Sequence, residues 1–285
     1  MILFKRPSDL IDFIQKKRKS AIKVGFVPTM GALHNGHLSL IKKSKSENDI
    51  TICSIFINPT QFSNPNDFEK YPISIETDIE QLELNGCDIL FMPSVNDIYP
   101  ENFQKNNFEL GYLDSILEGQ HRAGHFQGVC MVVKRLLEIV NCDILYLGQK
   151  DYQQCMVIKK MVLDLNIPVE IKISPTIREE NGLAMSSRNK RLNEGEKEAA
   201  LVIFEVLCFL KENIFERDIA DLKVKSVEKL KAKGFDIDYV EITDEFLNTI
   251  TTAEKKQTIV ALIAATIGNV RLIDNMILNN ANDAE

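Results

Sequence analysis

Two histidines three residues apart, His34 and His37, are the residues in this 285-residue chain whose type and spacing most directly indicate chemistry. They are two of only four histidines in the sequence, and Gly31 and Gly36 accompany them. Imidazole groups can hydrogen-bond to an anion or exchange a proton with it near neutral pH, and glycine lets the backbone come close to a ligand. The segment therefore predicts a binding site for a phosphate-bearing molecule.

The elements on either side of these histidines make that prediction more specific. An apolar run from Ala21 to Val27 precedes them and predicts a strand, and a helix-like segment begins near Leu38. In a parallel sheet, such a strand-to-helix turn presents backbone N–H groups and the positive end of a helix dipole to an anion. The two histidines are thus expected at a nucleotide-binding turn.

Strand-like and helix-like segments alternate over the first 175 residues. This alternation predicts an α/β fold with a Rossmann-like, doubly wound parallel sheet, whose ligands bind at the carboxyl ends of the strands. The further predicted strands are 51–57, 88–92, 143–147 and 169–174, and the predicted helices are 76–85, 129–140 and 151–165.

The pattern changes after Pro175. A polar stretch over 177–191 is followed by a long charged helix from Glu194, and strand-like runs occupy 238–242, 257–267 and 270–278. Gly268-Asn269 predicts a hairpin turn between the last two runs. The sequence therefore predicts two domains, a Rossmann-like one over 1–175 and a smaller α+β domain over 176–285.

Three further polar clusters fall at predicted strand ends or at the domain boundary. They are 58–62, 148–154 and 185–189. Each cluster alone is typical of an ordinary turn or helix cap. Together with the histidines, they bring imidazole, ammonium, guanidinium and hydroxyl groups toward one edge of a sheet, which indicates a single site.

Composition limits the kind of protein. The net charge of −7 disfavours a general nucleic-acid surface, and no apolar run approaches the roughly 20 residues needed to span a bilayer. The N-terminus lacks a signal-peptide pattern, so a cytoplasmic location is expected. The six cysteines contain no CxxC pair, which indicates reduced, mostly buried thiols.

A metal site is an alternative interpretation of the histidines. His34 and His37 could join His121 and His125 as four zinc ligands. Ala123-Gly124 disfavours a regular helix between the second pair, however, and a turn containing Gly36 suits an anion. The anion interpretation is therefore preferred.

The clusters 28–37, 58–62, 148–154 and 182–189, in this order, resemble the pantothenate synthetase (pantoate–β-alanine ligase) family. This family belongs to the nucleotidyltransferases with the "HIGH" signature. Asp238–Ile242 and Arg271–Asp274 resemble the C-terminal domain of the family. The resemblance covers almost the whole chain and implies ATP-dependent condensation of (R)-pantoate with β-alanine to pantothenate, in the pathway to coenzyme A.

The resemblance implies two chemical steps. ATP adenylates the carboxylate of pantoate and pyrophosphate leaves; the amine of β-alanine then attacks the pantoyl adenylate and AMP leaves. Fixed cations stabilise the charge that grows on pyrophosphate best where water is excluded. The expected catalytic residues are His34, His37, Lys150 and Arg188, with His37 either donating a proton or stabilising charge.

The same resemblance implies the binding residues. Gln61 is expected to bind pantoate and β-alanine and Gln154 to bind pantoate, with Arg122 near this pocket; neutral amides satisfy hydroxyls and a carboxylate without adding charge. Mg²⁺ is expected with ATP, with Asp78 and Gln81 as its ligands. The residues expected around ATP are Met30, Gly31, Ala32, Leu33, His34, Asn35, Gly36, His37, Gly148, Gln149, Lys150, Asp151, Ile177, Met185, Ser186, Ser187 and Arg188.

The partners implied are the small molecules ATP, pantoate and β-alanine, with no nucleic acid and no membrane. A homodimer is expected by resemblance, and the C-terminal domain is expected to close over the ATP site. Two departures from the family pattern affect intervening loops: Ile73 follows Tyr71-Pro72, and Ala123 replaces the usual proline after Arg122.

Two other functions compete with this one. The first is a nucleotidyltransferase that transfers AMP to a phosphate, but such an acceptor calls for more arginine or lysine than the Gln61/Gln154 pair offers. The second is a non-catalytic nucleotide-binding module, which the combination of His34, His37, Lys150 and Arg188 disfavours.

Overall fold

The chain is described by a computed structural model over residues 1–62, 65–104 and 106–281. Its contacts divide it into two compact units. The first comprises Met1–Gln149 with Gln153–Pro175, and the second comprises Lys150–Tyr152 with Thr176–Glu285. Across the described ranges, no helix combines the length and apolarity needed to cross a membrane.

The first unit is built on a six-stranded parallel sheet in the order β1-β4-β3-β2-β5-β6. The chain moves from β2 to β3 and β4 on one side, and from β5 to β6 on the other. The order therefore reverses between β2 and β5, the switch point beside which open α/β sheets bind ligands. The strands are β1 Ile2–Phe4, β2 Val24–Thr29, β3 Ile50–Ile55, β4 Ile89–Phe91, β5 Ile144–Gly148 and β6 Glu170–Ser174.

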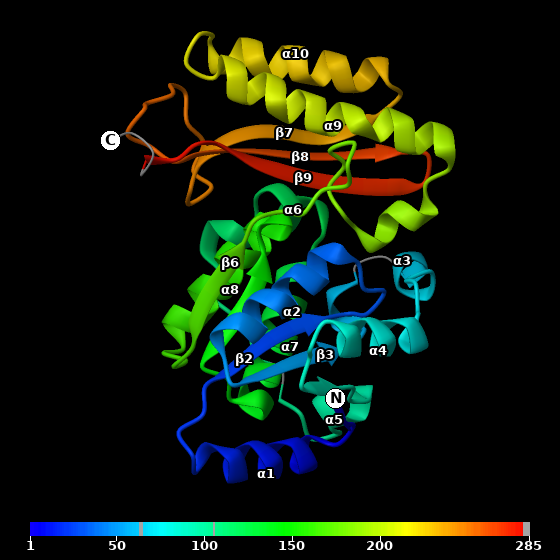
Figure 1. Ribbon diagram of the computed structural model, residues 1–285. Helices are drawn as coiled ribbons and strands as arrows, with labels where there is room; N and C mark the ends of the chain where they lie inside the picture. Colours follow the sequence, from blue (N-terminus) through cyan, green and yellow to red (C-terminus); the bar gives the residue numbers. More distant parts are fainter. Residues whose placement is uncertain (63–64, 105, 282–285) are drawn as a thin grey trace. The chain divides into compact units, whose positions relative to one another are not determined.

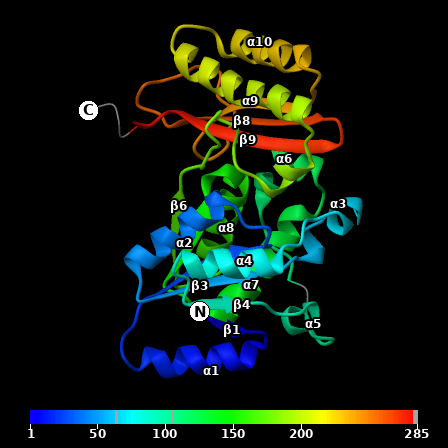
Figure 2. The same cartoon turned by 45° about the vertical axis from the view of Figure 1, so that its right-hand side comes forward.

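Helices cover both faces of this sheet, as its double winding requires (Figures 1 and 2). Helix α2 packs against β2, β3 and α4, whereas α1 packs against α7. The helices of this unit are α1 Pro7–Arg18, α2 Asn35–Glu47, α3 Pro65–Glu69, α4 Ile75–Leu84, α5 Val95–Ile98, α6 Leu117–His121, α7 His125–Val140 and α8 Tyr152–Asp164, and the 3-10 turns are η1 Pro59–Gln61, η2 Gly111–Asp114 and η3 Gln149–Asp151.

The second unit contains a three-stranded antiparallel sheet in the order β7-β8-β9 (Asp236–Asp244, Ile259–Ile267 and Val270–Asn279). Helices α9 (Glu194–Asn213) and α10 (Ile219–Ala232) lie together on this sheet (Figure 1). A capping box between Asn193 and Glu196 fixes the start of α9. The apolar residues of α9 face those of β8 and form the core of this unit.

The architecture predicted from the sequence is confirmed: a parallel α/β sheet and a smaller α+β domain with a hairpin between β8 and β9. The sequence did not predict edge strand β1 or helix α10. Two helices begin earlier than expected, α2 at Asn35 instead of near Leu38 and α7 at His125 instead of Val129.

The cysteines are reduced in this structure, and five of the six are buried; Cys208 is partly exposed. Burial raises the pKa of the Cys87, Cys130 and Cys142 thiols to about 12. A thiol, unlike a thiolate, is a poor nucleophile and metal ligand. These three cysteines therefore act as small apolar core residues.

Candidate active site

The loop between β2 and α2 is held in a strained conformation from two sides. Gly31 has φ +82° and Ala32 has φ +50°, which an alanine rarely adopts. The Asp78 carboxylate accepts hydrogen bonds from Ala32 N at 2.8 Å and Leu33 N at 2.9 Å, and Thr29 Oγ1 accepts one from Gly31 N at 3.2 Å. The loop is thus fixed before any ligand binds, as an anion site at a helix terminus requires.

Asp78 does not fit the expected role of magnesium ligand. It is 2% exposed, and Ser74 Oγ donates a further hydrogen bond to its Oδ1 at 3.0 Å. Both carboxylate oxygens therefore already serve the protein, whereas Mg²⁺ needs an open octahedral shell that usually keeps several waters. In the described part of the chain, no group of three or more His, Cys, Asp or Glu residues is arranged to hold a metal ion. Asp78 anchors the loop, and we derive no step through a metal.

The two histidines lie at the N-terminus of α2, with ring centroids 4.1 Å apart. His34 is the N-cap, and its Nδ1 accepts a hydrogen bond from Gly36 N at 3.2 Å. The neutral His34 ring therefore carries its proton on Nε2, where it can be donated to an anion. His37 stands in the first helical turn, because the helix begins before it and not after it as the sequence predicted. Both rings are thus set at the positive end of the helix dipole.

A chain of side-chain amides follows β3. Asn58 is 1% exposed, and its Nδ2 donates to Gln61 Oε1 at 3.0 Å and to Gly128 O at 3.1 Å. Its Oδ1 accepts from Tyr99 Oη at 2.9 Å and from Thr60 Oγ1 at 2.9 Å. These bonds fix the orientation of the Gln61 amide: its oxygen is occupied, so its Nε2 group is the one presented outward.

The Nε2 group of Gln61 contacts the loop between β2 and α2. Gln61 Nε2 lies 3.1 Å from Met30 Sδ. Two residues that the family resemblance assigns to different substrates, Gln61 to pantoate and β-alanine and Met30 to ATP, are therefore in contact. An amide donor at this place suits a carboxylate or hydroxyl oxygen.

Helix α7 packs against η1, the turn that carries Gln61. A Cβ on Gly128 would lie 2.3 Å from Thr60 O, so only glycine allows this close approach to η1. His125 Nδ1 donates to Gln61 O at 2.8 Å, since a carbonyl can only accept. Its Nε2 accepts from Arg122 Nη1 at 3.1 Å. Arg122, expected near the acid pocket, is therefore connected to Gln61 through a neutral His125.

Adjacent glutamines at the start of α8 lie in different environments. Gln153 is 3% exposed and its amide bonds to Leu113 O, Ile116 O and Glu118 N. Gln154 is only partly buried, and no hydrogen bond of its side chain to the described residues is present. Gln153 is thus a structural residue, whereas the role of Gln154 in binding pantoate stays a prediction.

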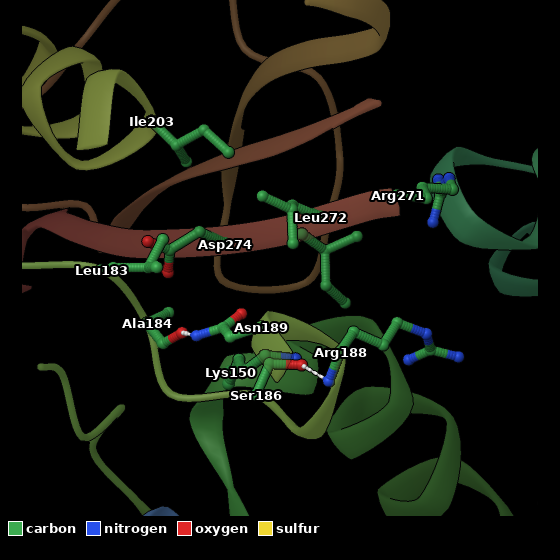
Figure 3. A pocket seen from close by; sticks show the side chains of 11 residues that line it. Lys150, Leu183, Ala184, Ser186, Arg188, Asn189, Ile203, Arg271, Leu272 and Asp274 are labelled. Atoms are coloured by element: carbon green, nitrogen blue, oxygen red, sulfur yellow. Dashed lines mark hydrogen bonds between the residues drawn. The ribbon is translucent and has the colours of Figure 1, made fainter. Parts of the chain in front are cut away.

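The second unit holds the expected cations in one pocket (Figure 3). Lys150, Ser186 and Arg188 line it together with Asp274 and Arg271. Ser186 Oγ accepts from Arg188 N at 3.2 Å and so shapes the turn that carries the arginine. The Lys150 ammonium lies 3.4 Å from Asp151 Oδ1. Arginine and lysine at such a place are typical of phosphate recognition.

The structure divides the expected site residues between the two units. His34, His37, Met30 and Gln61 gather in the first unit, and Lys150, Ser186 and Arg188 gather in the second. Gly148 ends β5, Gln149 and Asp151 form η3, Ile177 O accepts a hydrogen bond from Met185 N, and Ser187 is buried. The role of each of these residues toward ATP remains a prediction.

Sequence reasoning missed several residues of this geometry. Asn58 belongs to a cluster that the sequence singled out, so its role as a rigid amide partner had a signal. Asp274 lies in the segment Arg271–Asp274, which the sequence indicated only through its resemblance to the C-terminal domain of the family. Tyr99, Arg178 and Asn275 lie outside every cluster in sequence, and no local pattern indicated them.

The fold is that of an α/β protein with a histidine pair at a helix N-terminus in its first unit and a basic pocket in its second unit. Comparison with known proteins identifies its family. The family described as pantoate-beta-alanine ligase matches residues 2–277, and the chain belongs to this family of ligases.

Several pantothenate synthetases are similar to this chain over nearly its full length and nearly their own. The pantothenate synthetase of Aquifex aeolicus is 45% identical over 96% of this chain and 98% of its own length. The crystal structure of pantothenate synthetase from Thermus thermophilus has a TM-score of 0.90 at 36% identity, covering 98% of this chain and 100% of that one. The pantoate-beta-alanine ligase of Francisella tularensis, crystallised with beta-gamma ATP and beta-alanine, has a TM-score of 0.82 at 42% identity and covers 98% of both chains.

Proposed function

We propose that this protein condenses (R)-pantoate with β-alanine through a pantoyl adenylate and releases pyrophosphate and AMP. The observation that carries the proposal is the contact between Gln61 Nε2 and Met30 Sδ. It sets the candidate acid-binding amide directly beside the loop that leads to His34 and His37. The ligands of the Francisella protein support ATP and β-alanine as two of the substrates.

In the first step, a carboxylate oxygen of pantoate attacks the α-phosphorus of ATP, and the bond to the bridging oxygen of pyrophosphate breaks. The negative charge on pyrophosphate grows as it leaves. The Nε2–H group of His34 and the N-terminus of α2 stabilise this charge from the first unit, and Lys150 and Arg188 stabilise it from the second. His37 stabilises charge or donates a proton. Preorganised donors of this kind lower the barrier because they need no rearrangement during the reaction.

In the second step, the amine of β-alanine attacks the acyl carbon of the adenylate, and the bond to the AMP oxygen breaks. Gln61 and Gln154 hold the pantoyl group without adding charge near the anionic nucleotide. Neutral amides thus select the acid, while cations act only on phosphate.

The proposal also covers domain closure, oligomeric state and location. The C-terminal unit closes over ATP during the first step, since the two sets of phosphate donors lie in different units. A homodimer and a cytoplasmic location follow from the family resemblance. Sedimentation equilibrium tests the dimer.

The deciding experiment uses purified protein with ATP, Mg²⁺, (R)-pantoate and β-alanine, with products followed by mass spectrometry. We expect pantothenate and AMP in equal amounts, and pantoyl adenylate when β-alanine is omitted. Formation of ADP, or the absence of both AMP and pantothenate, would overturn the proposal. Replacing pantoate by inorganic phosphate is the control for AMP transfer to a phosphate.

A further inference from the structure

A buried ion pair in the second unit holds the segment that carries Arg188. Arg178 Nη1 donates to Asp274 Oδ2 at 2.5 Å, and Arg178 Nη2 donates to Asp274 Oδ1 at 3.1 Å. The same guanidinium donates to Gly182 O and Asn275 O and lies 4.6 Å from the centre of the Phe204 ring. All of these partners are protein groups, so both terminal nitrogens of Arg178 are bonded inside the unit and the residue acts as a fixed brace.

The brace determines where Arg188 lies. Residues 177–185 form a short antiparallel arm, with a bridge between Arg178 and Ala184. Asn189 Nδ2 donates to Ala184 O at 3.0 Å and to Glu179 Oε1 at 2.9 Å, so the turn around Arg188 is attached to this arm on its C-terminal side. Because Arg178 fixes the arm to β9, it fixes the turn as well.

The Lys150 segment is attached to the same point of β9. Asn275 Nδ2 donates to Lys150 O at 2.8 Å, and Asn275 N donates to Asp274 Oδ1 at 2.8 Å. Asn275 is 3% exposed and Asp274 is 5% exposed. A continuous set of hydrogen bonds therefore runs from Lys150 through Asn275 and Asp274 to Arg178.

From this geometry we infer that Arg178, Asp274 and Asn275 are positioning residues that set Lys150 and Arg188 at a fixed separation in the basic pocket. Arg178 and Asn275 do not line the pocket, whereas Asp274 does; the positioning role of all three residues rests on the proposed function. Two cations held at one spacing can act on one leaving pyrophosphate without losing side-chain freedom during the step. Misplacing such groups by about 1 Å can cost on the order of 10²-fold in rate.

Asn275→Ala is the sharpest test, because it removes the link to Lys150 without leaving a buried charge. We expect single-turnover formation of pantoyl adenylate, per active site, to fall by about 10-fold or more, with the KM for pantoate within about twofold of wild type. The matched control is Asn279→Ala, on the same strand, whose amide bonds to Lys255 O and Gln257 O. It should keep the wild-type rate.

Double mutants test whether these residues act through Lys150 and Arg188. If Asn275 acts through Lys150, then adding Asn275→Ala to Lys150→Ala should slow adenylation no further. Arg178→Lys should likewise add nothing to Arg188→Ala. Independent, multiplying losses would overturn the inference, and so would an Asn275→Ala rate per active site equal to wild type.

Active sites are counted from the amount of pantoyl adenylate formed in the first turnover. A merely structural role would lower this amount and leave the rate per site unchanged, which also contradicts the inference. If the wild-type protein makes no adenylate, the proposed function fails and this inference fails with it. If the wild-type protein is active and the losses multiply, only the inference fails.

Discussion

Individual residues owe their chemistry to the hydrogen bonds that orient them. The bond from Gly36 N to His34 Nδ1 places the imidazole proton on Nε2, and the bond from Asn58 turns the Gln61 amide so that its Nε2 group faces Met30. Neither orientation is available from the residue type alone. The proposed roles therefore depend on the partners of these residues as well as on the residues themselves.

Lys150→Ala tests the residue proposed to stabilise the leaving pyrophosphate. We expect pantoyl-adenylate formation to fall by about 10²–10³-fold, the usual cost of losing one preorganised donor at a developing charge, and quenched-flow measurement of the adenylate gives the rate. Lys223→Ala is a control in the same unit, since Lys223 pairs with Glu241 and lies outside the pocket lining. A loss of only a few-fold for Lys150→Ala would refute its assignment.

The neighbouring glutamines give a paired prediction. Gln154→Ala should raise the KM for pantoate by about 10-fold or more, the cost of a hydrogen bond to a charged group, and should leave ATP affinity and the unfolding temperature nearly unchanged. Steady-state kinetics and calorimetry measure these quantities. Equal damage to pantoate and ATP binding would contradict the assignment.

Gln153→Ala is the contrasting variant. It leaves one buried carbonyl, one partly buried carbonyl and one buried N–H without their partner. Its main effect should be a stability loss of about 1–3 kcal/mol, seen in urea unfolding.

At the scale of elements, the site is made where two helices approach the ends of strands. Helix α2 brings its N-terminus to the loop after β2, and helix α7 lies against η1, which carries Gln61. The contact of α7 with η1 has no room for a side chain at Gly128. The position of Gln61 therefore depends on a helix that begins 64 residues later, at His125.

Gly128→Ala tests this dependence. The new Cβ would meet backbone atoms of Thr60 at 2.3 Å and 2.6 Å, so the helix or η1 must shift. We expect a stability loss of about 1–3 kcal/mol, as for other overpacked sites, and a clear rise in the KM for pantoate. Gly195→Ala in α9 is the matched control, because its nearest contact is an ordinary 3.5 Å. It should be neutral or slightly stabilising. An unchanged KM in Gly128→Ala would contradict the proposed support of Gln61.

At the scale of the whole molecule, the proposed reaction needs residues of both units. In the first unit, side-chain bonds attach the C-terminal end of α2 to strands β5 and β6. Glu47, the last residue of that helix, accepts hydrogen bonds from Tyr146 of β5 and Lys172 of β6 and pairs with Lys43. These three partners lower the pKa of Glu47 to about 2. These bonds lie at the opposite end of α2 from His34 and His37, so they stabilise the sheet without entering the chemistry.

The lowered pKa gives a pH prediction. Glu47 stays ionised in the folded state to a lower pH than in the unfolded chain, whose value is 4.5. Its stabilising effect is therefore complete above about pH 5 and is lost as the pH falls toward 2. Glu47→Gln should lower the urea midpoint at pH 7, and the difference from wild type should shrink below pH 4.5. The control Glu138→Gln breaks only exposed pairs on α7 and should change little. A Glu47→Gln difference that does not vary with pH would contradict the account.

The sequence by itself determined the alternation of strands and helices, the polar clusters at strand ends and the change of fold after Pro175. These are local patterns, because apolar periodicity and turn residues act within a few positions. Family membership was also readable, since four clusters occur in one order. The start of α2 at Asn35 was missed because histidine is an uncommon N-cap residue. The His34 side chain nevertheless caps the beginning of this helix.

Only the tertiary structure decided which polar residues support which. Asn58 orients Gln61, Asp78 anchors the loop between β2 and α2, and the buried Gln153 amide is bonded to protein groups. Asp274 and Asn275 connect Lys150 with Arg178, although they lie more than 90 residues further along the chain. A sequence pattern shows that a polar side chain is present, but burial and the geometry of its partners decide whether it is used by the protein or by a ligand.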